Sequence, residues 1–221
     1  MITRRKAIFG LVLGPSIVAW GFAPGEFWDD KQPSEWSEKD VQRLLTKSPW
    51  AKGSAVEMSF GGMGGPGMGG PGMGPPGMDG PGGPGGPGGP SGMTALVRWE
   101  SAAPIRAAGK TKLRRDLSGS YVISVSGLDI LSDLGATMGA AGMESLKKGT
   151  SLQRSGKAPI APSSVTTSFD EAGVLLFYFP NDADPISPGD KQVVFQTKSE
   201  MFGWKVKFVL KDMQYRGKLA L

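Results

Sequence analysis

The sequence has no cysteine and no histidine among its 221 residues. Without cysteine no disulfide can brace the fold, so a buried core must hold the chain together. The two absences also exclude Ser-His and Cys-His nucleophilic catalysis, zinc sites made of thiolates or imidazoles, and the usual general base near neutral pH. An enzyme built on this chain would depend on carboxylates, Lys, Tyr or Ser.

Acidic residues are missing from the first 23 positions, where three basic residues at 4–6 precede an uncharged stretch at 7–23. This is the layout of a secretory signal peptide, and its paired arginines resemble a twin-arginine leader. We predict a signal peptide over 1–23, cleaved near Gly21, and export to the periplasm or the extracellular space. The alternative is an uncleaved membrane anchor formed by 7–23, which is short for a membrane span.

A strong net charge is also missing. The chain has 25 basic and 20 acidic residues, and loss of the three basic residues of the leader leaves 22 against 20, a net charge near +2. Nucleic-acid-binding proteins concentrate basic side chains on one face, so we predict no nucleic-acid partner. Lys205, Lys207 and Lys211 alternate along one segment, which we interpret as the solvated face of a strand. A membrane partner is expected only if the leader stays uncleaved.

Residues 61–93 contain 18 Gly, 8 Pro, 5 Met, one Asp and one Ser. Such a segment buries too little surface to offset its chain entropy, so we predict a disordered insert. The flanking segments 55–60 and 95–99 both have strand patterns. This favours an oversized hairpin loop inside one domain, and a linker between two units is the alternative.

Two helices are predicted. In the first, Ser37 is a suitable N-cap, Asp40 can return the hydrogen bond, and Pro49 ends the helix. The second is expected to begin at Asp129 and end near Gly149. The glycines that either weaken this second helix or bring it close to a sheet are Gly135, Gly139 and Gly142.

Alternating apolar and polar residues predict half-buried strands at 121–126 and 204–211, with further strands at 192–198 and 213–221. Residues 174–179 are apolar on both faces, which predicts a central strand covered on each side. We therefore expect a β-rich α+β fold, a sandwich or curved antiparallel sheet of about seven to nine strands with two packed helices.

The expected organisation begins with the signal peptide or N-terminal anchor at 1–23. A lead-in, a short helix and a first strand follow at 24–60, and the insert occupies 61–93. The β-rich body at 94–221 is expected to form one domain with residues 37–60, because so few residues precede the insert that they cannot fold alone.

Four methionines recur every five residues in the insert, at Met63, Met68, Met73 and Met78. Thioethers are soft ligands suited to Cu(I), so the repeat is a candidate site for this ion. The alternative interpretation is duplication of a low-complexity unit whose methionines bind nothing. No other cofactor is indicated.

Catalytic candidates are few. Ser145 and Lys148 match the Ser-x-x-Lys pattern of penicillin-recognising enzymes, but the partner motifs of those enzymes are missing. Two carboxylates facing each other would suit glycoside hydrolysis. The acidic pairs that offer this are Asp29 with Asp30, Asp170 with Glu171, and Asp182 with Asp184.

Four tryptophans could form an aromatic surface for sugars or peptides, although large aromatic residues more often lie in a core. They are Trp28, Trp36, Trp50 and Trp99.

Four segments, 48–52, 97–101, 121–128 and 210–219, resemble a family of predicted secreted soil-bacterial proteins with no assigned activity. The resemblance covers most of the chain after the leader and implies a glycine-rich insert at the same place. It implies no catalytic or binding residue.

Together these features favour an exported, non-enzymatic binding or structural module whose partner is an envelope protein or polymer. Handling of Cu(I) through the methionine repeat is the first alternative. A hydrolase that uses carboxylates or a Ser-Lys dyad is the second.

Overall fold

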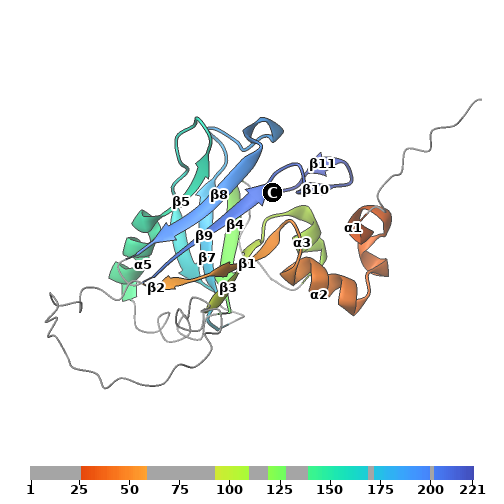
Figure 1. Ribbon diagram of the computed structural model, residues 1–221, viewed down its shortest axis with the longest axis horizontal. Coiled ribbons are helices and arrows are strands. Elements are labelled where there is room, and N and C mark those ends of the chain that lie inside the picture. The colour runs from red at the N-terminus through yellow and green to blue at the C-terminus, as the bar shows by residue number, and fades with distance from the viewer. Residues whose placement is uncertain (1–25, 59–92, 110–118, 128–138, 169–171, 200–201) are drawn as a thin grey trace, which may run out of the picture.

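The computed structural model describes residues 26–58, 93–109, 119–127, 139–168, 172–199 and 202–221. Within these ranges the chain forms a five-stranded sheet, a four-stranded sheet and a two-stranded ribbon, and every strand pairing is antiparallel. Helices pack at both ends of the two larger sheets (Figure 1). The predicted β-rich α+β class is confirmed.

The five-stranded sheet has the order β1-β3-β4-β7-β6. Its strands are β1 (Ala51–Ala55), β3 (Thr94–Trp99), β4 (Ser120–Ser126), β7 (Leu175–Pro180) and β6 (Ser164–Thr167). The four-stranded sheet has the order β2-β9-β8-β5. Its strands are β2 (Glu57–Met58), β9 (Phe202–Val209), β8 (Gln192–Lys198) and β5 (Thr150–Arg154).

The two sheets pack face to face as a sandwich, with β8 and β9 in front of β4 and β7 in Figure 1. Phe177 on β7 meets Phe195 on β8 at 5.3 Å between ring centroids, and Trp99 on β3 meets Phe208 on β9 at the same distance. Both contacts are edge-to-face, the arrangement that the ring quadrupoles favour. These four fully buried rings join the two sheets into one core.

Residues 51–58 close one side of the sandwich. β1 pairs with β3 up to Ala55 opposite Thr94, and the chain then crosses at Val56 to the other sheet, where β2 pairs with β9. Strands on the two sides of the insert pair, as predicted, and the strand predicted at 55–60 is confirmed only in part. Ala55 ends β1, Glu57–Met58 form β2 on the other sheet, and residues 59–60 lie outside the described residues. The strand that pairs with β3 begins at Ala51, earlier than predicted. One long strand was expected at 55–60, but the chain changes sheets there.

Strand β4 is buried on both faces, with Val122 and Ile123 fully buried and Ser124 only 1% exposed. The predicted strand at 121–126 is therefore confirmed, but the prediction that it is only half-buried is wrong. The burial was mispredicted because Ser124 is polar and yet buried. Its hydroxyl donates a 2.6 Å hydrogen bond to the buried carboxylate of Glu100. The prediction for 174–179 is confirmed, since β7 is an interior strand with apolar residues on both faces.

The helix α2 (Glu38–Thr46) is confirmed with its predicted cap. The Ser37 hydroxyl accepts from the Asp40 N–H at 3.1 Å, and the Asp40 carboxylate accepts from the Ser37 N–H at the same distance. The helix α5 (Gly139–Gly149) is the described part of the second predicted helix, whose expected start at Asp129 lies outside the described residues. A Cβ at Gly139 would meet no atom of the described residues within 4 Å, so no described sheet approaches the helix closely at this glycine.

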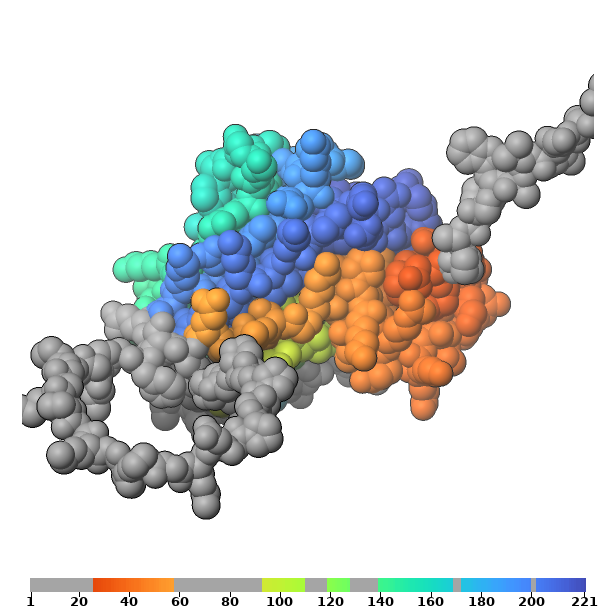
Figure 2. Space-filling model, viewed as in Figure 1, coloured from red at the N-terminus to blue at the C-terminus, as the bar shows by residue number. Residues whose placement is uncertain are grey.

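The segments near the two ends of the described chain lie side by side at one end of the sandwich, shown in orange and dark blue in Figure 2. There α1 (Phe27–Asp30), the 3₁₀ turn η1 (Pro33–Glu35) and α2 pack beside α3 (Ala103–Ala107) and the ribbon of β10 (Gln214–Tyr215) and β11 (Lys218–Leu219). The Trp50 indole N–H donates to the Ala220 carbonyl at 2.7 Å and ties the two segments together. None of the described helices is long and apolar enough to cross a membrane.

Candidate functional site

The methionines of the predicted Cu(I) site, Met63, Met68, Met73 and Met78, lie outside the described residues, so that site stays a prediction. Asp170 also lies outside them, as does Glu171. Within the described ranges, no three acidic side chains gather in a way that could hold a metal ion.

The predicted Ser-Lys pair lies on α5. Ser145 and Lys148 are both exposed, and among the described residues no hydrogen bond joins them. The neighbouring Lys147 instead pairs with Glu144 at 3.8 Å on the same helix. The structure thus places the two residues of the motif on an open helix surface and does not assemble them into a dyad.

Three carboxylates of the described acidic pairs contact other partners. Asp29 accepts the backbone N–H of Arg216 at 2.6 Å, and Asp182 accepts the N–H of Ala183 in a turn. Asp184 forms ion pairs with Arg154 at 2.8 Å and Lys157 at 3.3 Å. The structure therefore uses these carboxylates for turn and ion-pair contacts and does not set them against each other as a catalytic pair.

The Asp184 ion pairs belong to a network that also includes Asp190, which Lys157 contacts at 3.0 Å. Hydrogen bonds from Arg154, and then from Lys157, hold the pKa of Asp184 below its ordinary value. Burial acts to raise the pKa of Asp190, but the N–H of Ser187 and the Lys157 ammonium outweigh it, and the net shift is downward. Opposite charges that are already paired make this network structural.

All four candidate tryptophans are buried: Trp28 is 3% exposed, Trp36 8%, and Trp50 and Trp99 0%. Three of them lie in one edge-to-face cluster at the end of the sandwich, together with Phe27. The hypothesis that they form an aromatic binding surface is wrong, because three of them are buried in this end cluster and Trp99 is buried between the two sheets.

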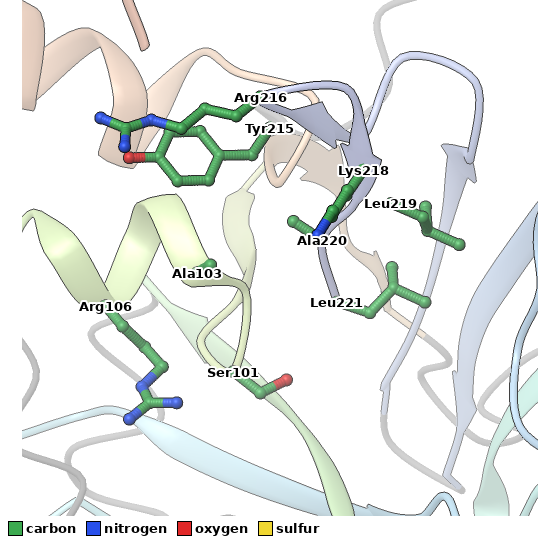
Figure 3. Close-up of a pocket in the computed structure, with 9 residues that line it drawn as sticks. All are labelled: Ser101, Ala103, Arg106, Tyr215, Arg216, Lys218, Leu219, Ala220 and Leu221. Carbon is green, nitrogen blue, oxygen red and sulfur yellow. The ribbon is translucent and has the colours of Figure 1, made fainter. Parts of the chain in front are cut away.

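The candidate site is a cleft of about 590 Å³ between α3 and the β10–β11 ribbon (Figure 3). We call it the basic cleft. It is lined by Ser101, Ala103, Arg106, Tyr215, Arg216, Lys218, Leu219, Ala220 and Leu221. Arg106 projects from the α3 side, Arg216 lies along the Tyr215 ring, and Leu219 and Leu221 lie on the far side (Figure 3).

The charge of the basic cleft has one sign among its side chains. Arg106, Arg216 and Lys218 line it, and no lining side chain is acidic. All three are exposed, and none forms an ion pair within the described part of the chain. Like charges that share a small concave surface raise the local concentration of anions. A second cleft of about 610 Å³ beside α2 is lined by one acid, Glu38, and one base, Lys39, and so has no such preference.

Arg216 is the most firmly held of the three cations. Its backbone N–H donates to Asp29 at 2.6 Å, its Nη2 donates to the side chain of Gln32 at 2.7 Å, and its guanidinium carbon lies 5.1 Å from the centre of the Tyr215 ring. Stacking on an aromatic ring and a fixed hydrogen bond together orient an arginine before any ligand arrives.

No local sequence pattern predicts this cleft. Its walls come from residues 101–106 and 215–221, which are far apart in the chain and carry no shared motif. Residues 213–221 were expected to continue one strand pattern, whereas Arg216 and Gly217 form a turn there. The one local signal was Gly217, since an isolated glycine in a strand pattern marks a turn or bulge.

Comparison with protein-family models, curated proteins and solved structures finds no match to this chain. The resemblance to predicted secreted soil-bacterial proteins stays a prediction.

Proposed function

We propose that this protein is an exported, non-enzymatic binding module that takes an anionic ligand in the basic cleft. The observation that carries the proposal is the set of three cationic side chains, Arg106, Arg216 and Lys218, around one cleft with no acidic side chain among its lining residues. A volume near 590 Å³ is within the range of small-ligand sites, which is about 300–1,000 Å³.

The leader supports export, because its layout is that of a signal peptide. An exported ligand-binding protein meets envelope polymers and proteins, many of which carry carboxylates or phosphates. A non-catalytic role is favoured because the candidate nucleophile Ser145 lies on an open helix surface and the candidate carboxylates Asp29, Asp182 and Asp184 contact backbone N–H groups or basic side chains. Catalysis would need two or more ionisable groups that converge in one cleft with opposed roles.

The physical basis of binding is charge attraction in a partly open site. Hydrogen bonds between charged groups contribute roughly 1.5–3 kcal/mol each when shielded, and less when exposed. Salt screens such contacts, since the Debye length is about 8 Å at physiological ionic strength. We therefore expect modest affinity that falls as salt is added.

The test is calorimetric titration of the purified protein with short polyglutamate at low and at physiological salt. A variant with Arg106→Gln, Arg216→Gln and Lys218→Gln should bind at least about tenfold more weakly, a loss of ~1.4 kcal/mol. The matched control carries Lys39→Gln, Lys148→Gln and Lys198→Gln. It makes the same change in net charge at exposed positions outside the basic cleft.

The control should keep the affinity of the unmodified protein. Equal weakening of both triple variants would mean that net charge alone attracts the ligand, and the basic cleft would lose its role.

A further inference from the structure

The turn between β10 and β11 contains an arginine at a position that arginine rarely takes. Arg216 and Gly217 are its two central residues, with Tyr215 paired to Lys218, and their φ angles are 52° and 74°. Two positive φ angles in a two-residue hairpin are the pattern of a type I′ turn, in which Asn, Asp or Gly is favoured at the first position. Arginine is disfavoured there because its Cβ crowds the backbone.

The surrounding structure holds this strained residue in place. Asp29 fixes its backbone, Gln32 and Tyr215 fix its guanidinium, and its other guanidinium N–H groups have no acceptor among the described residues. A strained conformation persists only when several surrounding contacts hold the residue in place, and such residues are concentrated at binding sites. The conformation of Arg216 therefore points to a use for its side chain at this position.

We infer that Arg216 binds a carboxylate of an extended acidic peptide that lies in the basic cleft. The inference rests on the proposed function and names its ligand class and its specificity residue. A guanidinium presents parallel N–H groups that match the two oxygens of a carboxylate, and a lysine ammonium does not.

Two features of the cleft favour a peptide. Leu219 and Leu221 add apolar surface opposite the guanidinium of Arg216, which suits a ligand whose acidic residues are followed by apolar ones (Figure 3). Within the described residues β11 pairs only with β10, so its other edge carries no strand. An extended peptide can add to such an edge through its backbone while alternate side chains enter the pockets beside it.

The opposite wall completes the arrangement. Arg106 extends from α3, so a peptide lying along β11 passes between Arg106 on one side and Arg216 and Lys218 on the other. Alternate side chains of an extended peptide point to the same side, so acidic residues at alternate positions meet the cations of one wall.

The test uses the full chain and a blocked peptide of alternating glutamate and leucine, with a glutamine-leucine peptide and inorganic polyphosphate as further probes. Arg216→Asn creates the Asn-Gly pair that suits a type I′ turn best. This variant should keep or raise the melting temperature while binding the acidic peptide at least about tenfold more weakly. Arg216→Lys should lose a similar share of affinity although it keeps the charge, because an ammonium lacks the parallel N–H groups of a guanidinium.

Lys191 provides the matched control. It is the other non-glycine residue at positive φ in the described chain, with φ of 60°, and it does not line the basic cleft. Lys191→Asn makes the same charge change and should leave peptide affinity unchanged. In the unmodified protein, the guanidinium N–H resonances of Arg216 should shift on addition of the glutamate peptide and not on addition of the glutamine peptide.

Full affinity in Arg216→Asn, with loss in the triple cleft variant, would overturn the inference and leave the proposed function standing. No binding loss in either variant would overturn both. Tighter binding of polyphosphate than of the glutamate peptide would overturn the peptide as ligand class. If Arg216→Lys bound the glutamate peptide as tightly as the unmodified protein, the role of the paired guanidinium N–H groups would be overturned.

Discussion

Gly149 is required by a contact that lies far from it in sequence. A Cβ added at this residue would lie 1.9 Å from the carbonyl oxygen of Lys198. The sequence explained this glycine as the end of a helix. It is the last residue of α5, but its φ is not positive, so the close approach of β8 is what excludes a side chain.

Gly149→Ala should therefore lower the free energy of unfolding by about 2 kcal/mol or more, since the backbone on both sides must shift. The measurement is urea denaturation followed by tryptophan fluorescence. Gly53→Ala is the control, because its Cβ would meet only Thr94 Cγ2 at an ordinary 3.4 Å, and its cost should be small. Equal stability of the two variants would show that α5 and β8 are not packed this closely.

At the scale of elements, one charged network joins β5 to the loop before β8. Arg154 on β5 donates both to the carbonyl of Asp184 and to its carboxylate, and Lys157 bridges Asp184 and Asp190. The pKa of both aspartates is lowered, and hydrogen bonds to Asp190 and then Asp184 raise the pKa of Lys157 above its ordinary value although partial desolvation opposes this.

The signs of these shifts define a pH window. The lowered carboxyl pKa values give stability that is present above the unfolded pKa, about 3.9, and lost as the pH falls through the folded values. The raised pKa of Lys157 gives stability that is present below about 10.4 and lost as the pH rises through the folded value. The network should therefore stabilise the fold most between these limits.

We predict that the melting temperature falls in acid more steeply for the unmodified protein than for Lys157→Met, which removes the bridging ammonium. Thermal unfolding from neutral pH to about pH 2.5 measures this. Lys148→Met, on the exposed side of α5 and outside the network, should keep the acid dependence of the unmodified protein. Parallel curves for all three proteins would contradict a stabilising role for the network.

At the scale of the whole molecule, the insert interrupts a pair of strands that hold each other. β1 and β3 remain paired through the register Ala51 to Arg98 and Ala55 to Thr94. Side chains of β1 also bond to the other sheet, since Lys52 Nζ donates to the carbonyl of Lys207 at 3.1 Å. Contacts that close the sandwich therefore lie on both sides of the insert.

Deletion of residues 63–88 should keep the fold and raise the free energy of unfolding by about 1 kcal/mol, because the loop to be closed becomes roughly threefold shorter.

The same protein tests the Cu(I) hypothesis in an anaerobic titration against a chromophoric competitor. If the methionine repeat binds Cu(I), the deletion abolishes that binding. A variant with leucine at positions 63, 68, 73 and 78 keeps the loop length and should lose Cu(I) binding without the gain in stability, whereas Cu(I) retained by either variant would contradict the methionine site.

Much of the fold was predictable where a pattern is carried by neighbouring residues. The Ser37 cap of α2, the strand at 192–198 and the interior strand β7 all follow from local spacing. The strand predicted at 204–211 is also present, although its bounds are 202–209. The predictions that failed depend on neighbours in space. Ser124 looked like a solvent-facing residue because the sequence does not show that Glu100, 24 positions earlier, accepts its hydrogen bond inside the sheet.

The sequence by itself determined the β-rich class, the cap of the first helix, the absence of disulfides and of histidine chemistry, and the leader pattern on which predicted export rests. Each of these depends on composition or on contiguous residues. Only the tertiary structure brought Arg106 into one cleft with Arg216 and Lys218, buried the four tryptophans, and paired Asp184 with Arg154. The physical reason is that a cleft, a buried face and an ion pair are made between segments brought together by core packing, and no local pattern records which segments will meet.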